Sequence, residues 1–262
     1  MEENPYLPKK YKILKIFPQT KDTSIFRLDC KFNHKPGQFV NVGIFGYGEC
    51  PISICSYSSD YIDLCIRDVG NVTHAIHQKK QGEDLWIRGP YGNGYPLEQF
   101  IDRDIILVGG GTGVAPLLGA IDYIEKNRAR FGKVHLLFGF RNDEAILFRS
   151  YFEKWASIFD FEFTLDCKSS KMQCSTGAVT TLLDKRAFNK NAVALICGPP
   201  VMIKFVVGSL LSKDISDFNM YISMERLMSC GLGKCGHCEV GGKYVCKHGP
   251  VFRYTNAKNM ID

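Results

Sequence analysis

The chain has 262 residues, of which 45% are hydrophobic and 23% are charged. This length supports one large folded domain or two small ones, and the composition excludes a disordered, collagen-like or coiled-coil chain. The net charge of +6 is not concentrated in blocks of lysine and arginine. We therefore expect no nucleic-acid partner.

The N-terminal segment has no basic stretch followed by an apolar run and a cleavage site, so we predict no secretory signal and a cytoplasmic protein. The longest uncharged run, Ile105 to Ile121, is short for a membrane span and is interrupted by glycines, among them Gly109, Gly110, Gly111 and Gly113, and by Pro116. We therefore expect no membrane span. This glycine-containing run needs another explanation.

The first hundred residues are predicted to form β-strands. Short runs rich in β-branched and aromatic residues are separated by Pro, Gly, Asn and Asp, a pattern typical of a small antiparallel barrel or sandwich. The runs are Tyr11–Phe17, Thr23–Leu28, Gln38–Phe45, Ile52–Tyr57, Tyr61–Arg67 and Asp84–Arg88. One segment between the last two, Thr73 to Lys80, has a helical pattern instead.

From about residue 101, apolar strands alternate with helical stretches, which predicts a parallel sheet with helices on its faces. After Ser223 this periodicity stops, and cysteine, glycine and turn residues dominate. The predicted fold class is therefore α+β with two domains, an antiparallel β-barrel (1–100) followed by a parallel α/β domain (101–222). A tail (223–262) follows, which needs a metal centre or a docking surface to fold.

Four of the eleven cysteines form a motif with a specific spacing. Cys230, Cys235, Cys238 and Cys246 follow the pattern C-x4-C-x2-C-x7-C. Its first part is the ligand loop of plant-type [2Fe-2S] ferredoxins, and in a reducing compartment clustered cysteines indicate metal binding rather than disulfides. A structural zinc site is the alternative, although zinc sites more often pair two C-x2–4-C knuckles.

Two glycine-containing turns follow apolar strands in the α/β half. The first contains Gly110, Gly111, Thr112 and Gly113, and glycines there let backbone amides approach a pyrophosphate at a helix N-terminus. The spacing is not the G-x-G-x-x-G of dehydrogenases, so a structural turn is equally compatible with it. The second turn, Cys197-Gly198-Pro199, also opens a helix. Two such turns at one sheet edge would bracket a ligand crevice.

The β-rich half carries weaker candidates for binding an anionic cofactor. Pro51, Ile52 and Ser53 lie in one predicted strand, and Arg67 ends another before the turn from Gly70 to Thr73. An arginine next to a Gly-x-x-Thr helix start supplies a cation, a hydroxyl and free amides to a phosphate. Ordinary turns and helix caps use the same residues, so spacing alone does not decide between these interpretations.

In this order, the motifs resemble those of the ferredoxin reductase-like flavoproteins, over roughly residues 9 to 257. Within that family, the chain resembles the electron-transfer subunits of dihydroorotate dehydrogenase, hydrogenase gamma subunits and the corresponding flavoprotein subunit of anaerobic sulfite reductase. The segments that look most like the last of these are GQFVNVGIFGYGECPIS, YIDLCIRDVGNVT, LWIRGPYGNGYP and SMERLMSCGLGKCGHCEVGGKYVCKHGPVF.

The resemblance implies an NAD(P)H-dependent flavin and iron–sulfur oxidoreductase that works as a subunit of a larger complex. NAD(P)H would give a hydride to FAD in the barrel, and electrons would pass singly through the [2Fe-2S] cluster of the tail to a catalytic partner. The implied partners are the iron–sulfur and siroheme subunits of a sulfite reductase complex. A hydrogenase or dihydroorotate dehydrogenase complex is the alternative, and a zinc-stabilised binding module is the non-enzymatic one.

The same resemblance assigns roles to the candidate residues. The four tail cysteines would hold the cluster, and Cys197 would help to position the nicotinamide. The flavin would contact Pro51, Ile52, Ser53, Ile66, Arg67, Gly70, Val72 and Thr73, and the nicotinamide cofactor would contact Gly110, Gly111, Thr112, Gly113, Gly198 and Pro199.

One departure from the family pattern concerns the flavin strand. Cys50 stands where many members carry an arginine, so Arg67 and backbone amides are expected to offset the pyrophosphate charge. We expect NADH rather than NADPH as the donor. Arg141 is the residue that would contact a 2′-phosphate if NADPH were used, and it is equally compatible with a surface salt bridge.

Overall fold

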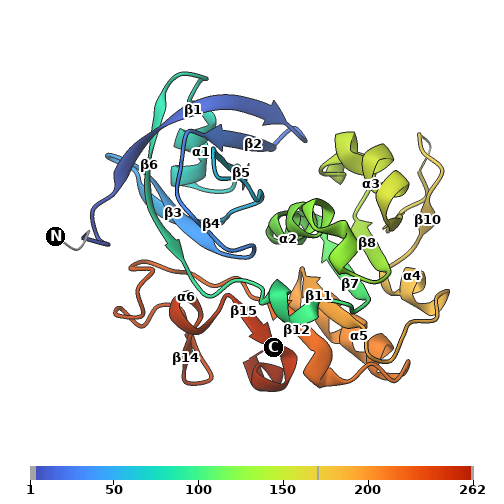
Figure 1. Cartoon of the computed structure of the whole chain (residues 1–262). Coiled ribbons are helices and arrows are strands. Elements are labelled where there is room, and N and C mark those ends of the chain that lie inside the picture. The colour runs from blue at the N-terminus through green and yellow to red at the C-terminus, as the bar shows by residue number, and fades with distance from the viewer. Residues whose placement is uncertain (1–3, 170, 261–262) are drawn as a thin grey trace.

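The computed structural model describes residues 4–169 and 171–260 (Figure 1). The N-terminal half is an antiparallel six-stranded sheet in the order β4-β3-β6-β1-β2-β5. A bridge between Ile54 and Leu64 brings its two ends together and closes the sheet into a barrel. The strands are β1 (Lys9–Pro18), β2 (Thr23–Leu28), β3 (Phe39–Ile44), β4 (Gly48–Ser53), β5 (Ile62–Arg67) and β6 (Asp84–Tyr91).

The barrel agrees with the sequence prediction except at one strand. The sequence predicts an extended run over Ile52–Tyr57, whereas β4 covers Gly48–Ser53. The reason is the tight turn before it, because Gly48 pairs with Ile44 and starts the β3–β4 ladder early. Pro51 is tolerated because β4 is an end strand of the sheet order. Helix α1 (Asn71–His77) lies where the sequence predicts a helical segment.

The second half is a seven-stranded sheet in the order β10-β9-β8-β7-β11-β12-β15, parallel except for its last strand. This confirms the predicted parallel α/β domain after the barrel. The strands are β7 (Ile105–Gly110), β8 (Val134–Phe140), β9 (Asp160–Leu165), β10 (Ser175–Thr176), β11 (Val193–Cys197), β12 (Met220–Ser223) and β15 (Val251–Arg253). The helices of this half are α2 (Ala115–Lys126), α3 (Phe152–Ile158), α4 (Thr180–Asp184) and α5 (Pro200–Leu211).

Both faces of this sheet are covered, which explains the uninterrupted apolar character of its central strands. Along β7, Ile105 and Leu107 pack in the cluster that contains α2 and α3, whereas Ile106 and Val108 pack in the cluster that contains α4 and α5. In Figure 1, α2 and α5 lie on opposite sides of the central strands. The sheet therefore fixes the carboxyl ends of β7 and β11 side by side.

The last forty residues are divided between a loop and the sheet. The loop leads to the hairpin of β13 (Glu239–Val240) and β14 (Lys243–Tyr244) and to the short helix α6 (Val245–His248). The chain then returns as β15, which pairs antiparallel with β12. The tail has no separate core, because its apolar side chains join the cluster under α5. Among the described residues, no helix has the length and apolar character needed to cross a membrane.

Candidate functional site

The first glycine-containing turn lies at the carboxyl end of β7, directly before α2. Gly110 ends the strand, and Gly111 to Val114 form a 3-10 turn that leads into the helix. Gly111 has a φ of 55°, in the left-handed region that glycine adopts without strain. The chain therefore reverses direction within four residues. The N-terminal end of the twelve-residue helix α2 then lies at the edge of the sheet.

The two predicted turns pack directly against each other, because β7 and β11 are neighbouring strands and Gly109 pairs with Cys197. A Cβ at Gly113 would lie 2.6 Å from the Cys197 carbonyl oxygen, and one at Gly110 would lie 2.3 Å from the Met202 sulfur. The approach at Gly113 is to backbone and permits only glycine, whereas a side chain at Gly110 would displace the flexible Met202 side chain. Gly113 is thus required by packing between the two turns, whatever it also does for a ligand.

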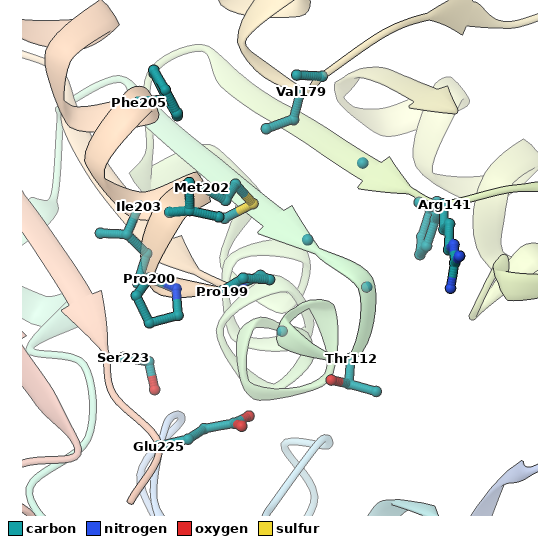
Figure 2. Close-up of a pocket in the computed structure, with 18 of the residues that line it drawn as sticks. Thr112, Arg141, Val179, Pro199, Pro200, Met202, Ile203, Phe205, Ser223 and Glu225 are labelled. Atoms are coloured by element: carbon teal, nitrogen blue, oxygen red, sulfur yellow. The ribbon is translucent and has the colours of Figure 1, made fainter. Parts of the chain in front are cut away.

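A cavity of about 840 Å³ opens between these turns (Figure 2). It collects all four residues of the first turn, together with Gly198 and Pro199 of the second. Arg67, from the end of barrel strand β5, also lines it, so the cavity extends from the α/β domain to the barrel. Its size suits an extended cofactor rather than a small metabolite.

Both ends of the cavity carry charged side chains, and Arg226 lines it beside Glu225. Arg141, which follows β8, and Asp166, which follows β9, line it together with the α4 segment. Ser223 and Glu225 line it near the tail, on the other side from Arg141 in Figure 2. The sequence interpretation missed Asp166 and Glu225, because a single acidic residue after a strand carries no distinctive spacing.

Cys197 is 1% exposed and is not among the residues that line the cavity. Burial raises the pKa of its thiol far above the ordinary value, and a hydrogen bond with Ser223 opposes that shift only in part. The thiol is therefore protonated at neutral pH and does not act as a thiolate. Any role in nicotinamide positioning is limited to packing from behind the turn.

The predicted flavin residues lie together on the barrel. Pro51, Ile52 and Ser53 form the last half of β4 and pair with β3, and α1, which contains Val72, packs against both strands. Ile66 is different, because its side chain is fully buried in the barrel core. It therefore offers a ligand only its backbone. Cys50, which replaces the arginine of the family pattern, is partly buried, and burial raises its pKa to about 11.

Arg67 and Thr73 both have protein partners. Arg67 donates from Nε to Asp22 at 2.8 Å, and this contact lowers the pKa of Asp22 to about 2. Thr73 Oγ1 accepts hydrogen bonds from the backbone of Val69 and Gly70 at 3.0 and 2.9 Å. The threonine hydroxyl thus shapes its own turn. Among the described residues, the hydrogen bond of Arg67 runs from Nε, and the residue lines the cavity.

Three of the motif cysteines lie in the loop after β12 and the fourth, Cys246, lies in α6. Backbone amides point at their sulfurs. Cys230 Sγ accepts from the Leu232 and Lys234 amides at 3.3 Å each, and Cys246 Sγ accepts from the Gly233 amide at 3.1 Å. Such bonds stabilise thiolate sulfur and contribute to the potential of a bound cluster. The x4 loop between the first two cysteines is short enough to direct its amides inward in this way.

The thiols are arranged as two pairs. Cys235 is hydrogen-bonded to Cys230, and Cys246 to Cys238. Backbone hydrogen bonds at Cys230 and His237 lower the pKa of Cys235 to about 7, whereas burial raises that of Cys246 to about 12. Over the described part of the chain, no three metal-ligating side chains converge as one ion requires. The four cysteines form the ligand set that either a [2Fe-2S] cluster or a structural zinc ion would take.

Comparison with known proteins identifies the family. Residues 107–208 match the oxidoreductase NAD-binding domain, and residues 225–257 match the iron–sulfur cluster binding domain of dihydroorotate dehydrogenase B. Sulfhydrogenase 2 subunit gamma from Pyrococcus furiosus is 39% identical, over 97% of each chain. This chain belongs to the family of the sulfhydrogenase gamma subunits and dihydroorotate dehydrogenase electron-transfer subunits. A probable member of the second group, from Thermococcus kodakarensis, is 34% identical over 92% of this chain and 94% of its own.

Solved structures share the fold of this electron-transfer family. A chain of an NADH-dependent reduced ferredoxin-NADP oxidoreductase has a TM-score of 0.77 and 22% identity, and the match covers 100% of this chain and 94% of that one. A ferredoxin NADP+ reductase from Neisseria gonorrhoeae with bound FAD and NADP has a TM-score of 0.67 and 21% identity, with 79% and 91% coverage. The barrel, the α/β domain and the C-terminal iron–sulfur segment predicted from the sequence are confirmed.

The predicted cofactor set agrees with these findings. The NAD-binding and iron–sulfur domains are matched directly, and the fold is one in which a solved reductase holds both FAD and a nicotinamide cofactor. The more specific resemblance to an anaerobic sulfite reductase subunit is not shown by these relatives, which are named for sulfhydrogenase and dihydroorotate dehydrogenase.

Proposed function

We propose that the protein oxidises NADH through FAD and delivers electrons one at a time, through a [2Fe-2S] cluster, to a catalytic subunit. The observation that carries this proposal is the position of the barrel. Arg67 at one end of it lines the cavity of the α/β domain, and the cysteine loop contacts strands β3 and β6 of the same barrel. A flavin bound on β4 would therefore lie between the nicotinamide cavity and the cluster loop.

The residues at the sheet edge would bind and orient the donor. Gly110 to Gly113 present amides at the N-terminal end of α2, where the helix dipole favours a pyrophosphate. Gly198 and Pro199 form the facing wall of the cavity. Asp166, at the end near Arg141, would accept hydrogen bonds from ribose hydroxyls and repel a 2′-phosphate, which supports NADH as the donor.

The barrel would hold FAD through Pro51, Ile52 and Ser53 of β4, with the backbone at Ile66 and the turn from Gly70 to Thr73 nearby. Arg67 is the cation placed to meet its pyrophosphate, with Asp22 holding the side chain in place from Nε. When bound, FAD supplies the conversion between a two-electron donor and a one-electron acceptor. Cys230, Cys235, Cys238 and Cys246 would hold that acceptor.

The catalytic partner is inferred from the relatives. Because a sulfhydrogenase gamma subunit matches nearly the whole chain at 39% identity, we propose a hydrogenase-type catalytic subunit as the partner, ahead of dihydroorotate dehydrogenase. The segments GPYGNGYP and MSCGLGKCGHC resemble those of the anaerobic sulfite reductase flavoprotein subunit, so siroheme and iron–sulfur subunits of such a complex are the alternative partner. A cytoplasmic location remains a prediction from the sequence.

The test is anaerobic purification from the native cell, followed by metal analysis, absorbance spectroscopy and identification of co-purifying chains. The proposal requires flavin absorbance, two irons per chain and bleaching of both chromophores by NADH. A colourless protein with one zinc would overturn it. Hydrogenase, dihydroorotate dehydrogenase or siroheme subunits among the co-purifying chains would distinguish the three partners.

A further inference from the structure

Arg88 is a buried arginine in the segment LWIRGPYGNGYP, and none of the roles assigned above involves it. It is located on β6, which pairs with β3 and β1, and only 7% of its surface is exposed. Burying a charged guanidinium is costly unless its N–H groups are paired with hydrogen-bond acceptors. The acceptors of Arg88 therefore indicate its structural role.

Two of the donor groups of Arg88 bind a carboxylate on the neighbouring part of the barrel. Its Nε donates to Glu49 Oε2 at 2.8 Å, and its Nη2 donates to the other oxygen, in the fork-to-fork arrangement that arginine makes and lysine does not. Glu49 belongs to β4 and directly precedes Cys50, at the start of the predicted flavin segment. The pair fixes the guanidinium plane relative to that strand.

The remaining donors reach the cysteine loop, about 140 residues away in sequence. Nη2 donates to the Ser229 carbonyl at 3.1 Å, and Nη1 donates to the carbonyl of Cys230, the first motif cysteine, at 3.0 Å. Asn41 Nδ2 on β3 also donates to the Ser229 carbonyl, at 3.0 Å. Three side-chain hydrogen bonds from the barrel therefore hold two consecutive carbonyls of the loop.

The surrounding contacts leave this segment little freedom. Tyr91 accepts a hydrogen bond from Arg88 Nη1 at 3.2 Å, and its ring lies against Gly231, where an added Cβ would approach to 2.7 Å. Asn41 is fully buried, and its Oδ1 has no hydrogen-bond partner among the described residues. Its Nδ2 donates both to Glu49 Oε1, at 3.3 Å, and to the loop, so this buried amide adds to the link between β4 and the loop.

We propose that Arg88, held by Glu49, is a positioning residue that fixes Cys230 against β4 and so sets the separation between the flavin strand and the cluster loop. The inference rests on the proposed function. Electron transfer between two bound cofactors requires a fixed distance between them. Here the flavin would be held by barrel strand β4 and the cluster by the cysteine loop, which are different parts of the chain. The guanidinium bonds both the β4 carboxylate and two cysteine-loop carbonyls. Asn41 Nδ2 supports the same link, with hydrogen bonds to Glu49 Oε1 at 3.3 Å and to the Ser229 carbonyl.

The test compares two variants in the intact chain with its cofactors. Arg88→Lys keeps the charge but loses the fork, so one ammonium cannot serve Glu49, Ser229 and Cys230 together. The double variant Glu49→Gln/Arg88→Gln removes both charges and leaves no unpaired buried ion. Both should keep iron content and NADH-driven flavin reduction. Both should transfer electrons from flavin to cluster about 10- to 100-fold more slowly, the usual cost of losing a contact that supports a metal ligand.

Two further measurements separate positioning from general stability. Hydrogen–deuterium exchange of residues 229–238 should rise in both variants, and the EPR spectrum of the reduced cluster should broaden because the loop is less uniformly held. Chemical reduction by dithionite reads the cluster directly, independently of NADH and flavin.

Arg27 supplies the matched control. It makes the same bidentate pair with Asp63, at 2.8 and 2.7 Å, elsewhere in the barrel, and its hydrogen bonds do not reach the tail. Arg27→Lys should leave exchange, EPR and transfer rate at wild-type values. Wild-type transfer, exchange and EPR in both Arg88 variants would overturn the inference. Wild-type protein without flavin or a two-iron cluster would instead overturn the proposed function.

Discussion

The molecule has two glycine-rich loops, and it supports them in different ways. The turn from Gly110 to Gly113 is continuous with a central buried strand and packs on the neighbouring strand end through backbone contact. The cysteine loop follows the carboxyl end of β12. It is held by side chains of the barrel, chiefly Arg88. The first is supported by close packing and the second by charged hydrogen bonds.

This difference follows from what each loop would hold. A pyrophosphate is bound by backbone amides and a helix end, so the turn only needs a rigid strand and helix behind it. A cluster bound by cysteines needs its loop placed relative to a second cofactor, and local packing within the loop cannot provide that. Changes in the turn should therefore affect donor binding alone, and changes in the loop should affect the cluster alone.

The largest expected effect is on the cysteine loop. Cys235→Ser removes one thiolate of the Cys230–Cys235 pair, so the [2Fe-2S] cluster should be lost completely while NADH still bleaches the flavin. Iron analysis and anaerobic absorbance measure both. Cys167→Ser, at an exposed cysteine outside the loop, is the control and should keep its iron. Unchanged iron in Cys235→Ser would show that the assigned ligand set is wrong.

The next largest effect is on the glycine turn. Gly113→Ala places a methyl group 2.6 Å from the Cys197 carbonyl oxygen, so the two turns must separate. NADH-driven flavin reduction should slow by about 100-fold, because a displacement near 1 Å disrupts the alignment of reacting groups. Stopped-flow absorbance measures the rate, and the cluster should be unaffected. Gly208→Ala, which has open space on α5, should leave the rate unchanged.

A smaller effect is expected at the end of the cavity that contains Arg141 and Asp166. Asp166→Ser removes the carboxylate that would repel a 2′-phosphate, with Arg141 on the same wall left to attract it. The ratio of kcat/KM for NADPH to that for NADH should rise by about tenfold, or about 1.4 kcal/mol. Asp60→Ser, at an exposed barrel position, should not change it. An unchanged ratio in the Asp166 variant would place the ribose elsewhere.

The last effect is on stability rather than on electron transfer, and it concerns the helix behind the glycine turn. Asp122 on α2 accepts a hydrogen bond from the Tyr57 amide of the barrel at 3.2 Å, and burial raises its pKa from 3.8 to about 6. Between these values the folded state binds more protons than the unfolded state, so stability falls as pH rises. The total loss by pH 7 should be about 1–3 kcal/mol.

Asp122→Asn should remove that slope and be the more stable protein at pH 7, because the amide oxygen still accepts the Tyr57 hydrogen bond without carrying a charge. Urea unfolding between pH 4.5 and 7.5 measures the effect. The same pH dependence in both proteins would assign it to another group. The iron content of the wild-type and Asp122→Asn proteins should be equal because, in the part of the chain that the structure describes, α2 does not support the cysteine loop.

The sequence by itself determined the order of the domains and the chemistry they carry. Uninterrupted apolar strands predicted the parallel sheet, because only a sheet covered on both faces buries them. The C-x4-C-x2-C spacing predicted the cluster loop, because short loops between ligands fix which atoms meet. Where the residues of a strand or ligand loop lie within a short stretch of chain, the sequence pattern was sufficient to predict that element.

What only the tertiary structure decided are the contacts between distant segments. The start of β4 at Gly48 depends on pairing with β3, Cys197 lies behind the cavity wall because its strand is central, and Asp166 reaches that wall from a third strand. Arg88 gave no sequence signal, since a lone arginine in a strand is ordinary until Glu49 and Cys230 are placed beside it. Folding brings such groups together across long separations, and no local spacing records that.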